Sequence, residues 1–230
     1  FIKHSAVSAS VLTAAICTSA SVFIFLIGKK LYNIETGVIA ALIIAFTPFI
    51  ITNSNFLLTD VPAITLTAIS FYLFLFNDKK YTMLFSGVFF SLAVLMKFTA
   101  VLMGLVFLVY FFVRKSSLKQ KINEIVIFSI GSLIIILPYL IWAQISLGSF
   151  LTPFIKGQSM VTDFNELKFF YFYNFIKAFD VISIIGLVLW IILSLINLKD
   201  KKYNNFKNDF IMVFWIVLFI FYLTKVPHKE

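Results

Sequence analysis

Long, almost continuous apolar runs separated by short polar stretches dominate the chain. None of these runs alternates apolar and polar residues over about ten positions, as the strands of a membrane barrel do, so helices are the only reasonable spanning elements. The candidate helices are Ser5–Ile27, Thr36–Thr52, Val61–Phe76, Tyr81–Met96, Thr99–Val113, Ile125–Ser146, Val181–Asn197 and Phe210–Thr224. The pattern therefore predicts an all-α bundle of about eight transmembrane helices.

The fourth and fifth segments are separated only by Lys97 and Phe98. A single helix from Tyr81 to Val113 would be about 50 Å long, whereas the hydrocarbon core is about 30 Å thick. It would also place the basic pairs at its two ends on opposite sides of the membrane, although basic loops tend to stay in the cytoplasm. We therefore expect a hairpin of two short helices with Lys97 at its tip.

Composition agrees with a membrane protein. Hydrophobic residues make up 61% of the chain and charged residues 13%, against about 45 to 50% and about 25% in soluble domains. A net charge of +9 would suggest nucleic acid in a soluble chain, but here the lysines gather between apolar segments, where they set topology. We expect an integral, multi-pass membrane protein in contact with membrane lipid, and no nucleic-acid partner.

The basic residues assign a side to each loop. With eight crossings, twelve of the 19 Lys and Arg residues fall in loops on one side, which the positive-inside tendency makes cytoplasmic. Asp60, Lys97 and His228 fall on the other side. Any chemistry is therefore expected on the extracytoplasmic face.

Several chemistries find no support in the sequence. Cys17 is the only cysteine, so neither an intrachain disulfide nor a cysteine-based metal site is expected. No Gly-rich phosphate loop is present, which argues against a nucleotide substrate. Because the chain opens at Phe1 without Met and stops in a polar run at Glu230, we interpret residues 1–230 as one transmembrane domain of a longer protein.

Thr59-Asp60-Val61-Pro62 places a lone carboxylate between two apolar runs. A carboxylate near hydrocarbon is costly and is rarely kept without a partner or a function, so Asp60 is a candidate site residue. Helix capping is the alternative, because Thr59 or Asp60 could accept from free backbone N–H groups and Pro62 fits a first turn.

Four local patterns together indicate a family. They are Gly28-Lys29-Lys30-Leu31-Tyr32-Asn33, Leu58-Thr59-Asp60-Val61-Pro62, Gly87 followed by Leu92 to Ala100, and Lys225-Val226-Pro227-His228-Lys229-Glu230. In this order they resemble the polytopic GT-C glycosyltransferases. The chain is most similar to glycosyltransferase family 39, which contains dolichyl-phosphate-mannose protein mannosyltransferases and the lipid A aminoarabinose transferase, while its terminal His-Lys-Glu is similar to the GPI and dolichol-pathway mannosyltransferases.

The resemblance implies transfer of a sugar, with inversion, from a polyprenyl-phosphate donor to a hydroxyl of an acceptor protein or glycolipid on the extracytoplasmic face. The lipid-linked sugar would be a substrate, so no cofactor is expected. The family places its general base in a first outer loop that would lie upstream of Phe1, and loss of a general base commonly removes a factor of about 10² to 10⁴. We therefore expect an N-terminal helix with that loop, and a C-terminal remainder, to lie outside residues 1–230, which alone would be inactive.

The resemblance also suggests roles for single residues. Asp60 matches the second acidic position of the family, which is not the base but lines the same cavity. Lys97 matches a lysine that meets the carrier phosphate, a contact suited to a compact ammonium; the alternative is a snorkelling lysine at a helix end. His228 and Lys229 could add a titratable group and a second cation to the cavity, or form an ordinary polar loop.

A membrane transporter or flippase for a lipid-linked substrate is the competing function. Transporters carry ionisable groups near the bilayer midplane and interrupted helices, whereas the acids and bases here collect at helix ends. Pro138, inside the sixth segment, is the one feature that favours a broken helix. The sequence therefore favours the enzyme.

Overall fold

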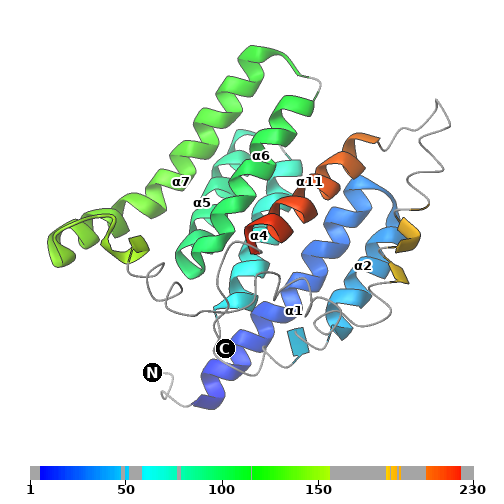
Figure 1. The fold of residues 1–230 in the computed structure, drawn as a ribbon, viewed down its shortest axis with the longest axis horizontal. Helices are drawn as coiled ribbons and strands as arrows, with labels where there is room; N and C mark the ends of the chain where they lie inside the picture. The colour runs from blue at the N-terminus through cyan, green and yellow to red at the C-terminus, as the bar shows by residue number, and fades with distance from the viewer. Residues whose placement is uncertain are drawn as a thin grey trace. The chain divides into compact units, whose positions relative to one another are not determined.

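The computed structural model describes residues 6–47, 50–51, 59–76, 79–114, 116–155, 206–223 and parts of 185–192. Throughout these ranges the regular structure is helical, which confirms the all-α class (Figure 1). The elements are α1 (Ala6–Leu31), α2 (Ile34–Phe46), α4 (Asp60–Leu75), α5 (Lys80–Met96), η1 (Phe98–Val101), α6 (Leu102–Val113), α7 (Leu118–Leu147) and α11 (Phe206–Leu223).

The chain divides into two compact units, residues 1–138 (unit 1) and residues 139–230 (unit 2). Unit 2 begins inside α7 and contains α11. The predicted segment Val181–Asn197 lies largely outside the described residues, and a single transmembrane domain over residues 1–230 stays a prediction.

The helix boundaries differ modestly from those expected. Helix α1 continues through Lys29 and Lys30 in its last turn, and α7 begins at Leu118 rather than Ile125. Helix α2 starts directly after Asn33, whose side chain accepts a hydrogen bond from the Thr36 backbone N–H at 2.7 Å. This side-chain cap satisfies one of the free donors of the first turn and fixes where the helix starts.

The predicted hairpin is confirmed. Helix α5 ends at Met96, Lys97 is extended (φ −148°, ψ 116°), and a short 3₁₀ turn, η1, leads into α6. The rings of Phe90 on α5 and Phe107 on α6 meet at 5.6 Å, so the two helices fold back on each other. The 17 residues of α5 give a length of about 26 Å, close to the hydrocarbon thickness of about 30 Å.

Helices α1 and α4 run parallel. Three contacts follow one another along both helices: Thr65 Oγ1 to the Ile16 carbonyl at 3.3 Å, Phe23 to Tyr72 at 5.8 Å, and Lys30 Nζ over the Phe76 ring at 4.5 Å. Parallel packing is what two helices separated by one intervening crossing would adopt.

Helices α4 and α5 run antiparallel and share a buried polar contact. Ser70 and Ser86 are fully buried, and each hydroxyl donates to the other residue's carbonyl at 2.8 Å. Small polar residues at a helix interface let backbones approach closely while satisfying their own hydroxyls, a common arrangement between membrane helices. The reciprocal bonds fix the register that brings the start of α4 to the end of α5.

Close approach also defines the contact between α5 and α7. A Cβ atom on Gly87 would lie 2.1 Å from the Phe128 carbonyl oxygen, and one on Gly131 would lie 2.0 Å from that of Leu84. Ser132 adds a hydrogen bond from its hydroxyl to the Gly87 carbonyl at 3.2 Å. Any larger side chain at either glycine would push the two backbones apart.

An aromatic cluster forms the core of unit 1. Phe74 on α4 stacks on Phe107 of α6 at 4.5 Å and meets Phe111 edge-on at 4.8 Å, and all three side chains are buried. Phe128 of α7 approaches Phe107 at 5.4 Å. Offset-stacked and edge-to-face ring pairs of this kind contribute about 0.5 to 1.5 kcal/mol beyond area burial, so the cluster binds α4, α6 and α7 together.

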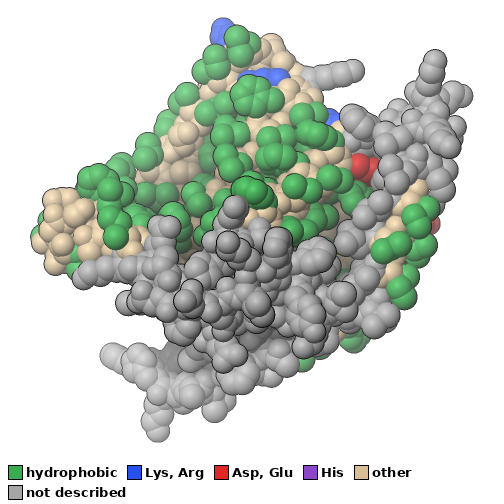
Figure 2. Space-filling view, in the orientation of Figure 1, with side chains coloured by type: hydrophobic (Ala, Val, Ile, Leu, Met, Phe, Trp, Pro, Cys, Tyr) green, Lys and Arg blue, Asp and Glu red, His purple; other side chains and the backbone are tan. Residues whose placement is uncertain are grey.

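Two of the described helices are long and apolar enough to cross a membrane: residues Val11–Leu31, with a mean hydropathy of 2.2, and residues Leu118–Leu147, with a mean hydropathy of 2.5. Four shorter apolar helices accompany them: Ile34–Phe46, Asp60–Leu75, Lys80–Met96 and Phe98–Val113. Large apolar side chains cover much of the described surface (Figure 2). Such an extensive apolar surface is typical of proteins that face lipid or a partner.

Candidate functional site

Asp60 and Lys97 lie 37 positions apart in the sequence and form an ion pair in which Lys97 Nζ donates to Asp60 Oδ1. Asp60 is the first residue of α4, and Lys97 lies between α5 and η1. Their side chains are 30% and 41% exposed, respectively. Two of the residues singled out in the sequence therefore meet at one end of unit 1.

Local backbone bonds hold Asp60 at the start of its helix. The Ala63 N–H donates to the Thr59 carbonyl at 3.0 Å, which closes the first turn. Pro62 stands in that turn, where its missing N–H removes no intrahelical bond. The side chain of Thr59 makes no capping hydrogen bond. The capping alternative therefore finds no support at Thr59, and the carboxylate of Asp60 is engaged by Lys97 instead.

The tip that carries Lys97 is fixed on both sides. Its N–H donates to the Ala93 carbonyl at 2.9 Å, and its own carbonyl accepts from the Ala100 N–H at 2.9 Å. Ala93 and Ala100 are both buried in an apolar cluster with Val94, against which Phe90 packs. The backbone is thus held in place while the flexible four-carbon side chain reaches toward Asp60.

Helix ends favour both charges. Asp60 occupies the first turn of α4, where the helix dipole and free N–H groups stabilise an anion, and Lys97 follows the last turn of α5, where a cation is stabilised. Because both side chains are about a third exposed, the pair itself contributes only about 0 to 1 kcal/mol. Chemically, the pair offers a carboxylate that can accept from a hydroxyl and an ammonium that can bind an anion such as phosphate.

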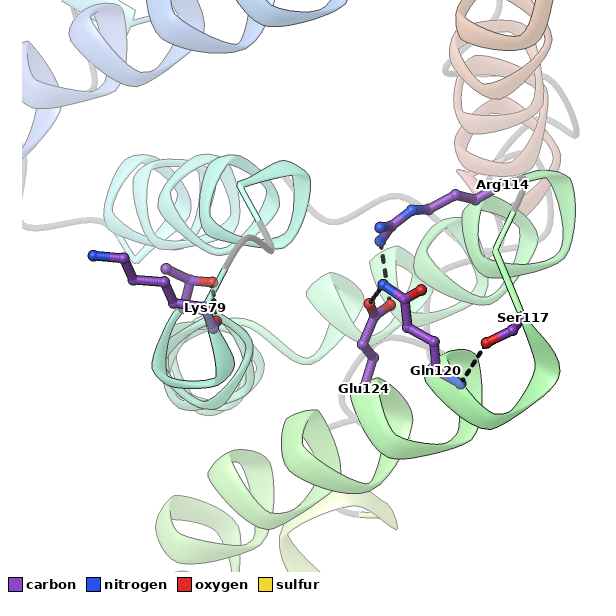
Figure 3. Close-up of polar contacts among 6 residues, drawn as sticks. Lys79, Arg114, Ser117, Gln120 and Glu124 are labelled. Carbon is purple, nitrogen blue, oxygen red and sulfur yellow. Dashed lines mark hydrogen bonds and ion pairs between the residues drawn. The ribbon is translucent and has the colours of Figure 1, made fainter.

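A second ion pair lies at the opposite end of unit 1, where α4 and α6 end together. Arg114 Nη1 contacts Glu124 Oε2 at 3.2 Å, Gln120 Nε2 donates to Glu124 Oε1 at 3.0 Å, and Ser117 Oγ accepts from the Gln120 N–H at 3.3 Å (Figure 3). The Glu124 side chain is only 8% exposed. This network joins α6 to α7. The sequence signal that could have revealed it is Glu124, a single acidic residue that follows a stretch of basic residues.

His228 and Lys229 lie outside the described residues. Tyr139 and Trp142 belong to unit 2, where their rings lie 5.7 Å apart. Within the ranges that the structure describes, no group of three or more His, Cys, Asp or Glu side chains could hold a metal ion.

Two helices long and apolar enough to cross a membrane, a buried seam of small residues and a charged pair at helix ends are typical of a membrane protein, with a candidate site at one end of unit 1. The particular family follows from comparison: the model for dolichyl-phosphate-mannose-protein mannosyltransferases matches residues 2–142, more than half of the chain. The chain belongs to this family of lipid-donor glycosyltransferases, which confirms the resemblance to the GT-C class. Comparisons with curated proteins and with solved structures find no match.

Proposed function

We propose that this protein transfers a mannosyl group from a polyprenyl-phosphate donor to an acceptor hydroxyl on the extracytoplasmic face, at a site that includes Asp60 and Lys97. The observation that carries the proposal is the ion pair between these residues, both within the region that the family model matches. The acceptor is a protein or a glycolipid.

In this proposal Lys97 binds the phosphate of the lipid donor. When the bond from the sugar to the phosphate oxygen breaks, negative charge develops on the phosphate, and a cation aimed at that oxygen stabilises the transition state. An ammonium on a flexible stem supplies a point charge that can follow the phosphate as it changes. The partial exposure of Lys97 leaves room for this contact.

Asp60 is proposed to orient polar groups of the donor or acceptor rather than to act as the general base. Its carboxylate is held by a cation, and a base must instead reach the proton of the acceptor hydroxyl. His228 and Lys229 stay candidates for a titratable group and a second cation.

An eight-helix topology would place the Asp60–Lys97 pair on the extracytoplasmic face. The parallel α1 and α4 and the antiparallel α4 and α5 fit alternating crossings. Basic residues mark the other end of unit 1, at the end of α1, the start of α5 and the end of α6: Lys29, Lys30, Lys79, Lys80 and Arg114. Basic helix ends favour the cytoplasm, so the Asp60–Lys97 end faces away from it.

The test is mannose transfer by the full-length protein reconstituted in liposomes, with polyprenyl-phosphate-mannose as donor and a Ser/Thr-containing peptide or a glycolipid as acceptor. Lys97→Gln should lower transfer sharply, and Lys97→Arg should lower it partly, because Arg keeps the charge but presents a wider fork. Lys119→Gln, at an exposed lysine of α7, is the matched control and should keep full transfer. Movement of the donor between leaflets without transfer to either acceptor would instead support a flippase.

A further inference from the structure

The Asp60–Lys97 pair leaves Lys97 with an anionic partner before any lipid binds. We propose that Asp60 competes with the lipid phosphate for Lys97, so that the phosphate binds by displacing Asp60 and leaves when Asp60 returns. This inference rests on the proposed function, since it requires that Lys97 bind the phosphate.

The geometry allows such an exchange without moving a helix. The backbones at Thr59 and Lys97 are held by hydrogen bonds to Ala63, Ala93 and Ala100. Both charged side chains are about a third exposed, and within the described residues neither side chain makes another hydrogen bond. Rotation of the long Lys97 side chain is therefore sufficient to exchange one anion for another.

Asp60 tolerates the separation because its position stabilises an anion without Lys97. It occupies the first turn of α4, beside free backbone N–H groups. Glu124 offers the contrast, because its side chain is almost fully buried and is held by both Arg114 and Gln120. Losing its cation would leave a buried charge without a counter-ion, so only the Asp60 pair is suited to exchange.

The phosphate is more negatively charged in the product than in the donor, so an exchange with Asp60 would help the product to leave. In the donor the phosphate is a diester with one negative charge. When the acceptor oxygen bonds to the sugar, the bond from the sugar to the phosphate oxygen breaks, its electron pair stays on that oxygen, and the acceptor proton passes to the general base. The product is a phosphate monoester, with a charge of about −1.5 to −2 at neutral pH. Lys97 alone would hold this product more tightly than the donor, and the return of Asp60 promotes its release.

The test measures binding of farnesyl phosphate, a short polyprenyl monophosphate, to the full-length protein in lipid nanodiscs. Asp60→Asn removes the competing charge and should tighten binding about three- to tenfold, which is near the lower end of typical coupling between two binding events, roughly 5- to 150-fold. Asp60→Glu keeps the competitor and should bind as the parent does. Lys97→Gln should weaken binding about tenfold, and adding Asp60→Asn to it should change nothing further, since both act through one contact.

Product inhibition of mannose transfer gives a second readout. The same Asp60→Asn change should lower the concentration of farnesyl phosphate that halves transfer by about the same three- to tenfold factor. A merely structural role for Asp60 would not raise the affinity for product. Thermal unfolding of each variant, compared with that of Asp60→Glu, reports whether the fold is intact.

The outcomes separate this inference from the function on which it rests. If Lys97→Gln weakens binding but Asp60→Asn leaves it unchanged or weaker, the competition is wrong and the phosphate contact of Lys97 stands. If Asp60→Asn tightens binding equally in the Lys97→Gln background, Asp60 repels phosphate without exchange, which also overturns the inference. If Lys97→Gln leaves binding unchanged, the proposed phosphate site itself is wrong.

Discussion

Unit 1 carries an ion pair at each end, and the two pairs differ in how far they are withdrawn from solvent. Lys97 and Asp60 are 41% and 30% exposed, whereas Arg114 and Glu124 are 22% and 8% exposed. Gln120 donates a further hydrogen bond to Glu124, while among the described residues Lys97 alone bonds to the Asp60 side chain. Depth and extra bonds make the Arg114–Glu124 pair structural, and exposure makes the Asp60–Lys97 pair available to a ligand.

The two ends of unit 1 also differ in charge. The end with Arg114 carries the basic residues of the α1, α5 and α6 termini, and the end with Asp60 carries a neutral pair. In the proposed topology the basic end faces the cytoplasm and the Asp60 end faces the other side, where the proposed chemistry occurs.

The largest expected effect is in labelling by an impermeant thiol reagent added outside cells. In a protein whose native Cys17 is replaced by serine, Phe98→Cys should react and Lys119→Cys should react only after the membrane is opened. Both positions are exposed at opposite ends of unit 1. The reverse pattern would contradict the assignment of the two ends to the two sides.

The next largest effect is on stability, because substitutions in the two ion pairs should lower the free energy of unfolding by different amounts. Glu124→Ala leaves Arg114 and Gln120 without their shared partner, so we expect a loss of about 2 to 3 kcal/mol in the free energy of unfolding. Asp60→Asn should lose no more than about 1 kcal/mol, because its pair is exposed. Denaturant or thermal unfolding in detergent gives both values. Equal losses would show that exposure does not distinguish the pairs.

The smallest expected effect is at Thr59. Its side chain makes no capping bond, so Thr59→Ala should change stability by no more than about 0.5 kcal/mol. Asn33→Ala is the matched change at a real cap, where the side chain accepts from Thr36, and should cost about 1 kcal/mol. A larger loss at Thr59 than at Asn33 would restore the capping interpretation of the Thr59-Asp60 sequence.

The sequence was sufficient for the helical class and for the hairpin, because an overlong apolar run and its flanking lysines allow few arrangements. It also singled out Asp60 and Lys97, since charges beside hydrocarbon are costly enough to stand out. It did not reveal the contact between them, which depends on the register set by Ser70 and Ser86, nor the Arg114–Glu124 pair. Register arises from the packing of small residues, and a linear pattern does not encode which helix faces which.

Helix boundaries were the second feature that the sequence did not predict accurately. Helix α7 begins seven residues earlier than the apolar pattern predicts, at Leu118 rather than Ile125. The polar residues of its first turns are satisfied by Ser117 and by the Arg114–Glu124 network. Hydrophobic periodicity alone misses such a start, because capping and ion pairing extend a helix beyond its apolar part.

The most direct test of the central claim, that Asp60 and Lys97 form a functional pair, is the rate of mannose transfer by full-length protein carrying Asp60→Asn or Lys97→Gln. Rates are normalised to folded protein and compared with those of Glu124→Gln, a change in the structural pair. The account predicts a loss of about 10²-fold for Lys97→Gln, as expected for removing one group that stabilises developing charge. It predicts a loss of at least about tenfold for Asp60→Asn, because Asp60 orients the reacting groups, and parental transfer for Glu124→Gln. Parental rates for both Asp60→Asn and Lys97→Gln would contradict it.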